Sequence, residues 1–127
     1  MDTISYKKCI ELLHDVSSDH GFLASAENTS NYKRVWARDG VICGLAALAS
    51  EDEKLIQTFR ITLETLANNQ HKIGTIPSNV LINEETIEVS YGGLAGRVDA
   101  VTWFIIGICQ YTFHTKDNSL IVKYEEV

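Results

Sequence analysis

Residues 40–49 read GVICGLAALA, and this stretch decides the fold that the sequence predicts. A helix over these residues would be apolar on nearly every side, and a helix without a polar face must be buried all round. A second apolar stretch, Val98 to His114, predicts another helix of the same kind. Its most apolar part, residues 100–109, is short of the roughly 20 apolar residues that a membrane-spanning helix needs. We therefore expect both helices to be buried in protein.

Segments on either side of these stretches predict helices with one polar face. Residues 3–17 and 52–69 place apolar side chains at helical spacing, and residues 119–127 look like the beginning of a fifth helix. Exposed and buried helices therefore alternate along the chain, whereas every helix of a plain four-helix bundle is amphipathic. We predict an all-α fold of about five helices, in which inner helices are covered by outer ones and residues 1–127 form a single unit.

The connections between the predicted helices differ in length. Ser50 and Glu53 have the spacing of a capping box, so Ser50 is the predicted cap of the helix that follows. Residues 20–35 are rich in Ser, Asn and Gly and predict a loop, and residues 70–97 form a second long connection. Residues 87–91 alternate between apolar and polar types, which allows one short strand. Loops of this length in compact domains are usually functional.

The overall charge and the cysteines narrow the class of protein. The net charge is −6, with 17 acidic and 11 scattered basic residues, so we expect no nucleic-acid partner. Cys9, Cys43 and Cys109 lie in apolar stretches and have no metal-ligand spacing, so we predict buried thiols. The histidines are not paired at metal spacing either, and we expect no metal and no other cofactor. The first twenty residues hold no apolar signal segment, which indicates a cytoplasmic protein.

Both apolar helices are predicted to begin with an arginine and an aspartate. These are Arg38 and Asp39 in one helix, and Arg97 and Asp99 in the other. If the inner helices run parallel, the four side chains meet at one end of the molecule. The alternative is purely structural, because Asp is a favoured helix N-cap and its charge suits the helix dipole. Three glycines among residues 91–96 favour a functional role, since they indicate a backbone that a ligand approaches closely.

The chemistry of these residues suits a sugar site. A general acid for glycoside cleavage must hold a proton, whereas the N–H groups of a helix start favour an ionised carboxylate. Asp99 can therefore act as the acid only where burial or a second carboxylate outweighs the helix start. Asp39 is better suited to binding sugar hydroxyls. Trp36 and Tyr32 can offer aromatic faces to a sugar ring, and Gln70 can offer an amide. The alternatives are ordinary packing for the two aromatic residues and a structural role in the loop for Gln70.

Three groups of residues resemble one known family: Trp36-Ala37-Arg38-Asp39-Gly40, Gln70 with Gly74-Thr75-Ile76-Pro77, and Gly96-Arg97-Val98-Asp99 with Trp103. They resemble segments of the (α/α)6-toroid glycoside hydrolases, and above all bacterial proteins of the glycogen-debranching, amylo-α-1,6-glucosidase type. The neutral invertases are similar, with an Arg-Asp at one helix start and an Asp followed by a Trp at another. The resemblance spans about residues 21 to 124.

The resemblance implies a toroid of inner and outer helices that binds sugar at the N-terminal ends of the inner ones. Asp99 matches the general acid of the family, and Trp36, Arg38 and Asp39 match the subsite for the cleaved sugar. Such enzymes usually invert the anomeric configuration with a second carboxylate as base. Because this chain would supply only the N-terminal part of the toroid, the base is expected beyond Val127.

The sequence thus predicts a glycosidase acting on an α-glucan or a related glucoside, as part of a longer enzyme. Gln70, Tyr91 and Arg97 complete the predicted sugar contacts. Two alternatives stay open: a neutral-invertase-like sucrose hydrolase, and a helical sugar-binding domain without chemistry. An incomplete toroid would leave apolar helix surface uncovered, so the expected partners, besides a carbohydrate, are the rest of the toroid or a second copy of the chain. No membrane partner is expected.

Overall fold

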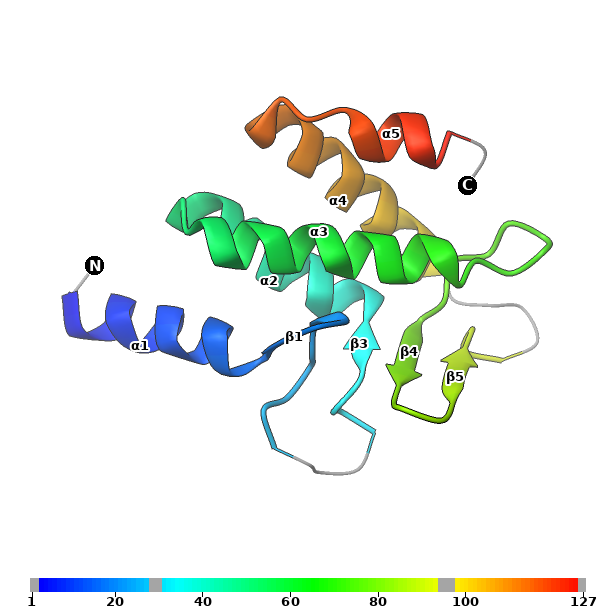
Figure 1. The fold of residues 1–127 in the computed structure, drawn as a ribbon, viewed down its shortest axis with the longest axis horizontal. Helices are drawn as coiled ribbons and strands as arrows, with labels where there is room; N and C mark the ends of the chain where they lie inside the picture. Colours follow the sequence, from blue (N-terminus) through cyan, green and yellow to red (C-terminus); the bar gives the residue numbers. More distant parts are fainter. Residues whose placement is uncertain (1–2, 28–30, 94–97, 126–127) are drawn as a thin grey trace.

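The computed structural model describes residues 3–27, 31–93 and 98–125, and these ranges contain five helices and five strands (Figure 1). The helices are α1 (Thr3–Asp15), α2 (Ala37–Ser50), α3 (Glu53–Asn68), α4 (Val98–Thr115) and α5 (Ser119–Lys123). The strands are β1 (Ser17–Ser18), β2 (Gly21–Phe22), β3 (Val35–Trp36), β4 (Asn79–Ile82) and β5 (Ile87–Ser90).

The all-α prediction is wrong, because short antiparallel strands occupy both of the long connections. β1 pairs with β2, and β4 lies between β3 and β5 in a three-stranded sheet. The alternation at residues 87–91 allowed for β5, but β3 pairs with a partner far along the chain, Val35 with Val80. No local pattern reports such a pairing. The chain is therefore a mixed α/β unit and not part of an (α/α)6 toroid.

The two apolar helices are neighbours, and their first turns lie side by side. α2 packs against both α3 and α4, and both α2 and α4 run from right to left in Figure 1. Arg38 in the first turn of α2 lies 3.5 Å from Asp99 in the first turn of α4. The expectation that these helices are adjacent, with their starts at the same end, is confirmed.

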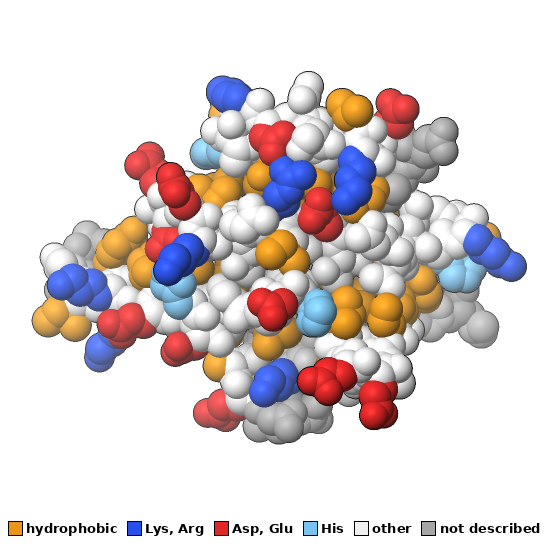
Figure 2. All heavy atoms as spheres, in the orientation of Figure 1, with side chains coloured by type: hydrophobic (Ala, Val, Ile, Leu, Met, Phe, Trp, Pro, Cys, Tyr) orange, Lys and Arg blue, Asp and Glu red, His pale blue; other side chains and the backbone are white. Residues whose placement is uncertain are grey.

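Neither apolar helix is buried on every side, contrary to the prediction. The fully buried side chains of α4 come from one face: Ala100, Phe104, Gly107 and Tyr111. The opposite face exposes Val98 (81%), Ile105 (56%) and Phe113 (67%). The reason is geometric, since α4 packs on α2 and α3 with one face, and the short helix α5 contacts α4 without covering the rest of its surface. The part of α1 that the structure describes has no buried residue at all, and Figure 2 shows hydrophobic side chains at the surface over α1, at the left of the view.

We expect the chain to self-associate through the exposed face of α4, because exposed apolar patches drive association. Sedimentation velocity should show a sedimentation coefficient that rises with protein concentration. Ile105→Lys should abolish the rise, since it places a charge in the middle of the patch. Gln110→Lys adds the same charge at an exposed polar position of the same helix and should leave the rise intact. A monomer at all concentrations in the unmodified chain would contradict this expectation.

Ion pairs attach the α4–α5 connection to α3. The Arg60 guanidinium of α3 lies 2.6 Å from Asp117 and 3.7 Å from Glu64, and the Lys123 ammonium lies 3.3 Å from Glu64.

The face of the molecule in Figure 2 shows both basic and acidic side chains, without a continuous basic stripe.

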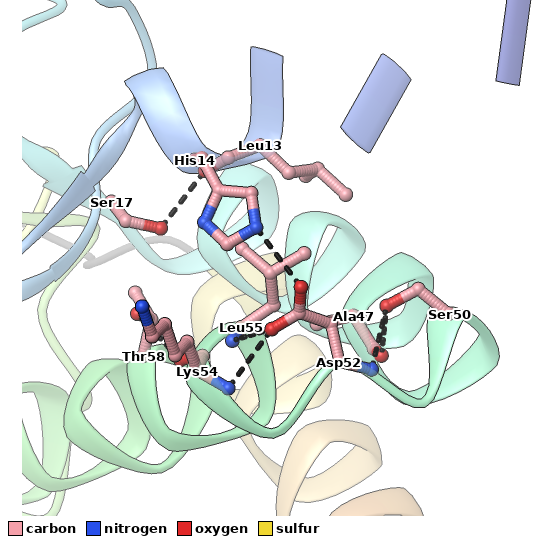
Figure 3. A network of polar contacts seen from close by, with 9 residues as sticks. All are labelled: Leu13, His14, Ser17, Ala47, Ser50, Asp52, Lys54, Leu55 and Thr58. Atoms are coloured by element: carbon pink, nitrogen blue, oxygen red, sulfur yellow. Dashed lines mark hydrogen bonds and ion pairs between the residues drawn. The ribbon is translucent and has the colours of Figure 1, made fainter. Parts of the chain in front are cut away.

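The cap of α3 is Asp52 and not Ser50, which corrects the predicted capping box. The Asp52 carboxylate accepts hydrogen bonds from the backbone N–H groups of Lys54 and Leu55, at 2.9 and 3.2 Å. Ser50 instead ends α2, where its hydroxyl donates to the carbonyl of Ala47. The second Asp52 oxygen lies 3.0 Å from Nε2 of His14, so one carboxylate starts α3 and ties α1 to it (Figure 3).

The Asp52 cap predicts acid-sensitive stability. The backbone N–H of Leu55, and then the hydrogen bond with His14, lower the pKa of Asp52. A carboxyl whose pKa is lowered on folding stabilises the protein above its unfolded pKa of about 3.9, and that contribution is lost as the pH falls through the lower folded pKa. Asp52→Ala should therefore lower the melting temperature at pH 7, on the order of 4 °C for a chain of this size.

The matched variant for this test is Asp52→Asn, because Asn caps helices nearly as well as Asp but does not titrate. It should lose less stability than Asp52→Ala at pH 7. Melting curves between pH 7 and pH 2.5 should converge for the unmodified chain and Asp52→Asn as the pH falls. Parallel curves over the whole range would contradict the role assigned to the Asp52 charge.

The cysteines are less buried than predicted. Cys9 and Cys109 are exposed and Cys43 is half-buried, and all three are free thiols. Cys9 lies on α1 and Cys109 on the uncovered side of α4, so the apolar stretches around them do not imply burial here.

In the described ranges, no helix is both long enough and apolar enough to cross a membrane. The apolar stretch that raised the question, residues 100–109, lies within α4 and packs one of its faces against α2.

Candidate functional site

The sheet sets the position of the first turn of α2. β3 runs directly into the helix, and Trp36 is both the last residue of the strand and the helix N-cap. The backbone N–H of Ala37 donates to the carbonyl of Ser78 at 3.0 Å, which attaches the helix start to the segment leading into β4. Asp39 is therefore in the first turn and is not the N-cap, although its charge at this position still suits the helix dipole.

The first turns of α2 and α4 form a polar depression on the surface. Nη1 of Arg38 lies 3.5 Å from Oδ2 of Asp99, with side chains 54% and 43% exposed. The lining residues are Trp36, Ala37, Arg38, Asp39, Ser78, Asp99 and Ala100. Its volume is about 10 Å³, room for about one water molecule. A ligand as large as a sugar ring would lie across this depression and not inside it.

Asp39 also lines a much larger cavity on the other side of its helix turn. This cavity of about 450 Å³ lies between the end of α1, residues 23–27 and α2. Within the described part of the chain, the half-buried Asp39 carboxylate has no hydrogen bond or ion pair, in contrast to that of Asp99. Asp39 is therefore the carboxylate in this region that is available to a ligand from either side.

Trp36 contributes an aromatic surface whose polar edge is already engaged. Its indole N–H donates to the carbonyl of Asn31 at 3.1 Å. Its ring stacks on that of Tyr32, with centroids 6.2 Å apart and planes 28° from parallel. Trp36 can therefore contact a ligand through its ring but not through its N–H group.

Gln70 and Tyr91 line neither cavity, and both make internal hydrogen bonds. The Gln70 amide donates to the carbonyl of Gly74 at 3.0 Å. The Tyr91 hydroxyl donates to the carbonyl of Asn69 at 2.8 Å, and its ring packs edge-on against His71. Together they hold the turn after α3. The structure does not bring these two predicted sugar contacts into the depression.

Arg97 and the second half of the glycine-rich approach to α4, residues 94–96, lie outside the described residues. In the described part of that approach, Gly92 and Gly93 have φ angles of 81° and 106°, which gives a conformational reason for glycine at both positions and leaves the close approach of a ligand a prediction. Only glycine adopts such angles without strain.

Several residues that line the depression and the larger cavity could not be predicted from the sequence. Ser78 reaches the depression because its backbone and hydroxyl both bond to the carbonyl of Ser90 in the neighbouring strand. Glu27, Ile42 and Cys43 line the larger cavity. Nothing in the local sequence marks them, since the cavity exists only where three distant segments meet.

The described residues contain no group of three or more histidine, cysteine or acidic side chains that could hold a metal ion. No family model, no curated protein and no solved structure matches this chain.

Proposed function

We propose that this chain carries the sugar-binding and proton-donating residues of a glycoside hydrolase that acts on an α-glucan or a related glucoside. The observation that carries the proposal is the meeting of Arg38, Asp39 and Asp99 at one depression, from two separate helix starts. Charged side chains of this kind bind sugar hydroxyls, and a carboxylic acid protonates the glycosidic oxygen as its bond to carbon breaks.

Asp99 is the proposed acid. An arginine partner favours the charged form of a carboxylate, whereas a general acid must hold a proton. The Arg38–Asp99 pair is long and about half exposed, and pairs of that kind contribute little. A sugar lying across the depression would exclude water from Asp99, and loss of water disfavours the charged form. Substrate binding itself would then favour the protonated acid.

Asp39 and Trp36 are the proposed binding residues. The Asp39 carboxylate has no other partner among the described residues and can accept hydrogen bonds from two sugar hydroxyls. Trp36 stands beside it in the lining and can pack its ring against the apolar face of a sugar. The proposal assigns no residue of this chain as the base that activates water.

The test is incubation of the full-length protein with a maltooligosaccharide that carries an α-1,6-linked glucose branch. Released glucose is followed by NMR spectroscopy at early times, before its anomers equilibrate. An inverting enzyme should release β-glucose first. Release of α-glucose first would overturn the inverting mechanism, and absence of both release and binding would overturn the sugar site.

Two alternatives are separate outcomes of the same experiment. Cleavage of sucrose without cleavage of the branched glucan would indicate a neutral-invertase-like hydrolase. Binding of the glucan without any release of glucose, unchanged in an Asp99→Asn variant, would indicate a sugar-binding domain without chemistry.

A further inference from the structure

The cavity between α1, residues 23–27 and α2 has the size of a small-molecule site. Its volume of about 450 Å³ falls within the range of roughly 300–1,000 Å³ that is typical of ligand pockets. Backbone hydrogen bonds fix residues 23–24 of its wall to Val16, another lining residue, and to Arg34 outside the lining. The N–H of Leu23 donates to the carbonyl of Val16 at 2.8 Å, and the N–H of Ala24 donates to that of Arg34 at 3.0 Å. The cavity is therefore held open by the fold.

Most side chains that line the cavity are apolar, and the charged ones among them are acidic. The apolar lining comes from Leu12, Leu13, Val16, Leu23 and Ile42. The charged lining residues are Asp39 and Glu27, and no described lysine, arginine or histidine lines the cavity. Two basic residues that are adjacent in sequence to lining residues are engaged elsewhere, since Arg38 pairs with Asp99 and His14 with Asp52. An apolar body carrying a positive charge is complementary to this lining.

We propose that this cavity binds a small organic cation with an apolar body, an aryl- or alkylammonium compound whose charged group contacts Asp39. The apolar part would displace water from the leucine and isoleucine side chains, which stabilises binding roughly in proportion to the area covered. The half-buried Asp39 carboxylate attracts the ammonium group more strongly than a fully hydrated one would, because the effective dielectric constant is lower there. The cavity is separate from the depression of the proposed sugar site, but the two share Asp39.

Cys43 provides a reporter inside the cavity. It lines the wall and is half-buried, whereas Cys9 and Cys109 are exposed and lie outside the lining. Burial, and to a lesser degree the charge of Asp39, raise the pKa of the Cys43 thiol, so it should react slowly with iodoacetamide. A ligand in the cavity would block the reagent from Cys43 alone.

The test compares two probes with the same apolar body, 4-phenylbutylamine and 4-phenylbutyrate, on the full chain. Iodoacetamide labelling of each cysteine is followed by mass spectrometry. At a concentration of about ten times its dissociation constant, the amine should slow labelling of Cys43 about tenfold, because only about one tenth of the sites remain empty. Labelling of Cys9 and Cys109 should not change. The butyrate should not protect Cys43 at the same concentration.

Variants assign the effect to the cavity. Ile42→Trp fills the space and should abolish protection of Cys43 by the amine, and Ala26→Trp provides a second occlusion from the opposite wall if the first variant fails to fold. Asp39→Asn should weaken amine binding about tenfold or more. Asp15→Asn removes the same charge from an exposed position of α1 outside the lining and should leave amine binding unchanged. Equal protection by the amine and the butyrate, or protection by neither, would overturn the proposal.

Discussion

Asp99→Asn should lower the turnover of a natural glycan by about 10²- to 10⁴-fold, the usual contribution of a general acid. Asn preserves the size of the side chain and its hydrogen-bonding capacity, but it cannot donate a proton to the leaving oxygen. Sugar binding should therefore persist, because Asp39 and Trp36 are unchanged. The measurement is kcat together with the dissociation constant of the glycan, so that loss of chemistry is separated from loss of binding.

A substrate that does not need protonation is the control for this variant. The fluoride of a glycosyl fluoride leaves with little proton transfer, so Asp99→Asn should affect its hydrolysis much less than that of the glycan. If the variant turned over the natural glycan at a near-normal rate, Asp99 would not be the acid. Its pairing with Arg38 would then be the whole of its role.

Gly44→Ala should lower the free energy of unfolding by about 3 kcal/mol or more, at the upper end of what overpacked cores cost. Gly44 lies where α2 touches α3, and a Cβ at this position would overlap the ring of Phe59. Phe59 is completely buried and packs edge-on against Tyr111, so its ring has no room to withdraw. The gain in helix propensity from Gly to Ala, about 1 kcal/mol, offsets only part of the loss. Urea unfolding followed by circular dichroism measures the change.

Two further variants test the cause of that loss. Phe59→Leu in the Gly44→Ala background should recover part of the stability, because the smaller side chain vacates the overlapped space. Gly107→Ala should cost less than Gly44→Ala. Its Cβ would lie 2.8 Å from Cδ2 of Leu63 and 3.0 Å from Cγ2 of Val41, which are the ends of side chains that can shift. If Gly107→Ala lowered the free energy of unfolding strongly and Gly44→Ala did not, the contact of Gly44 with Phe59 would not set the spacing between α2 and α3.

The candidate site was predictable in part, and the difference between its residues has a physical cause. The meeting of Arg38, Asp39 and Asp99 was predictable because each residue lies at the start of an apolar helix. The two apolar stretches are plain in the sequence, and their helices begin side by side. Gln70 and Tyr91 were predicted from types of side chain alone. In the structure their polar groups bond to the backbone of residues 69–74, because a turn after a helix leaves carbonyls that need donors.

The sequence by itself determined where the long helices lie, because the 3.6-residue period of apolar side chains is a local property of the chain. The helices predicted at residues 40–49, 52–69 and 98–114 correspond to α2, α3 and α4; the ends agree within one residue, except that α2 begins three residues earlier, at Ala37. Only the tertiary structure decided the class of the fold, since β3 and β4 pair across a long stretch of intervening chain. It also decided which part of the surface of α4 stays exposed, and it brought three distant segments together to line the large cavity. An apolar side chain signals that burial is favourable, but the neighbours that provide the burial come from elsewhere in the chain.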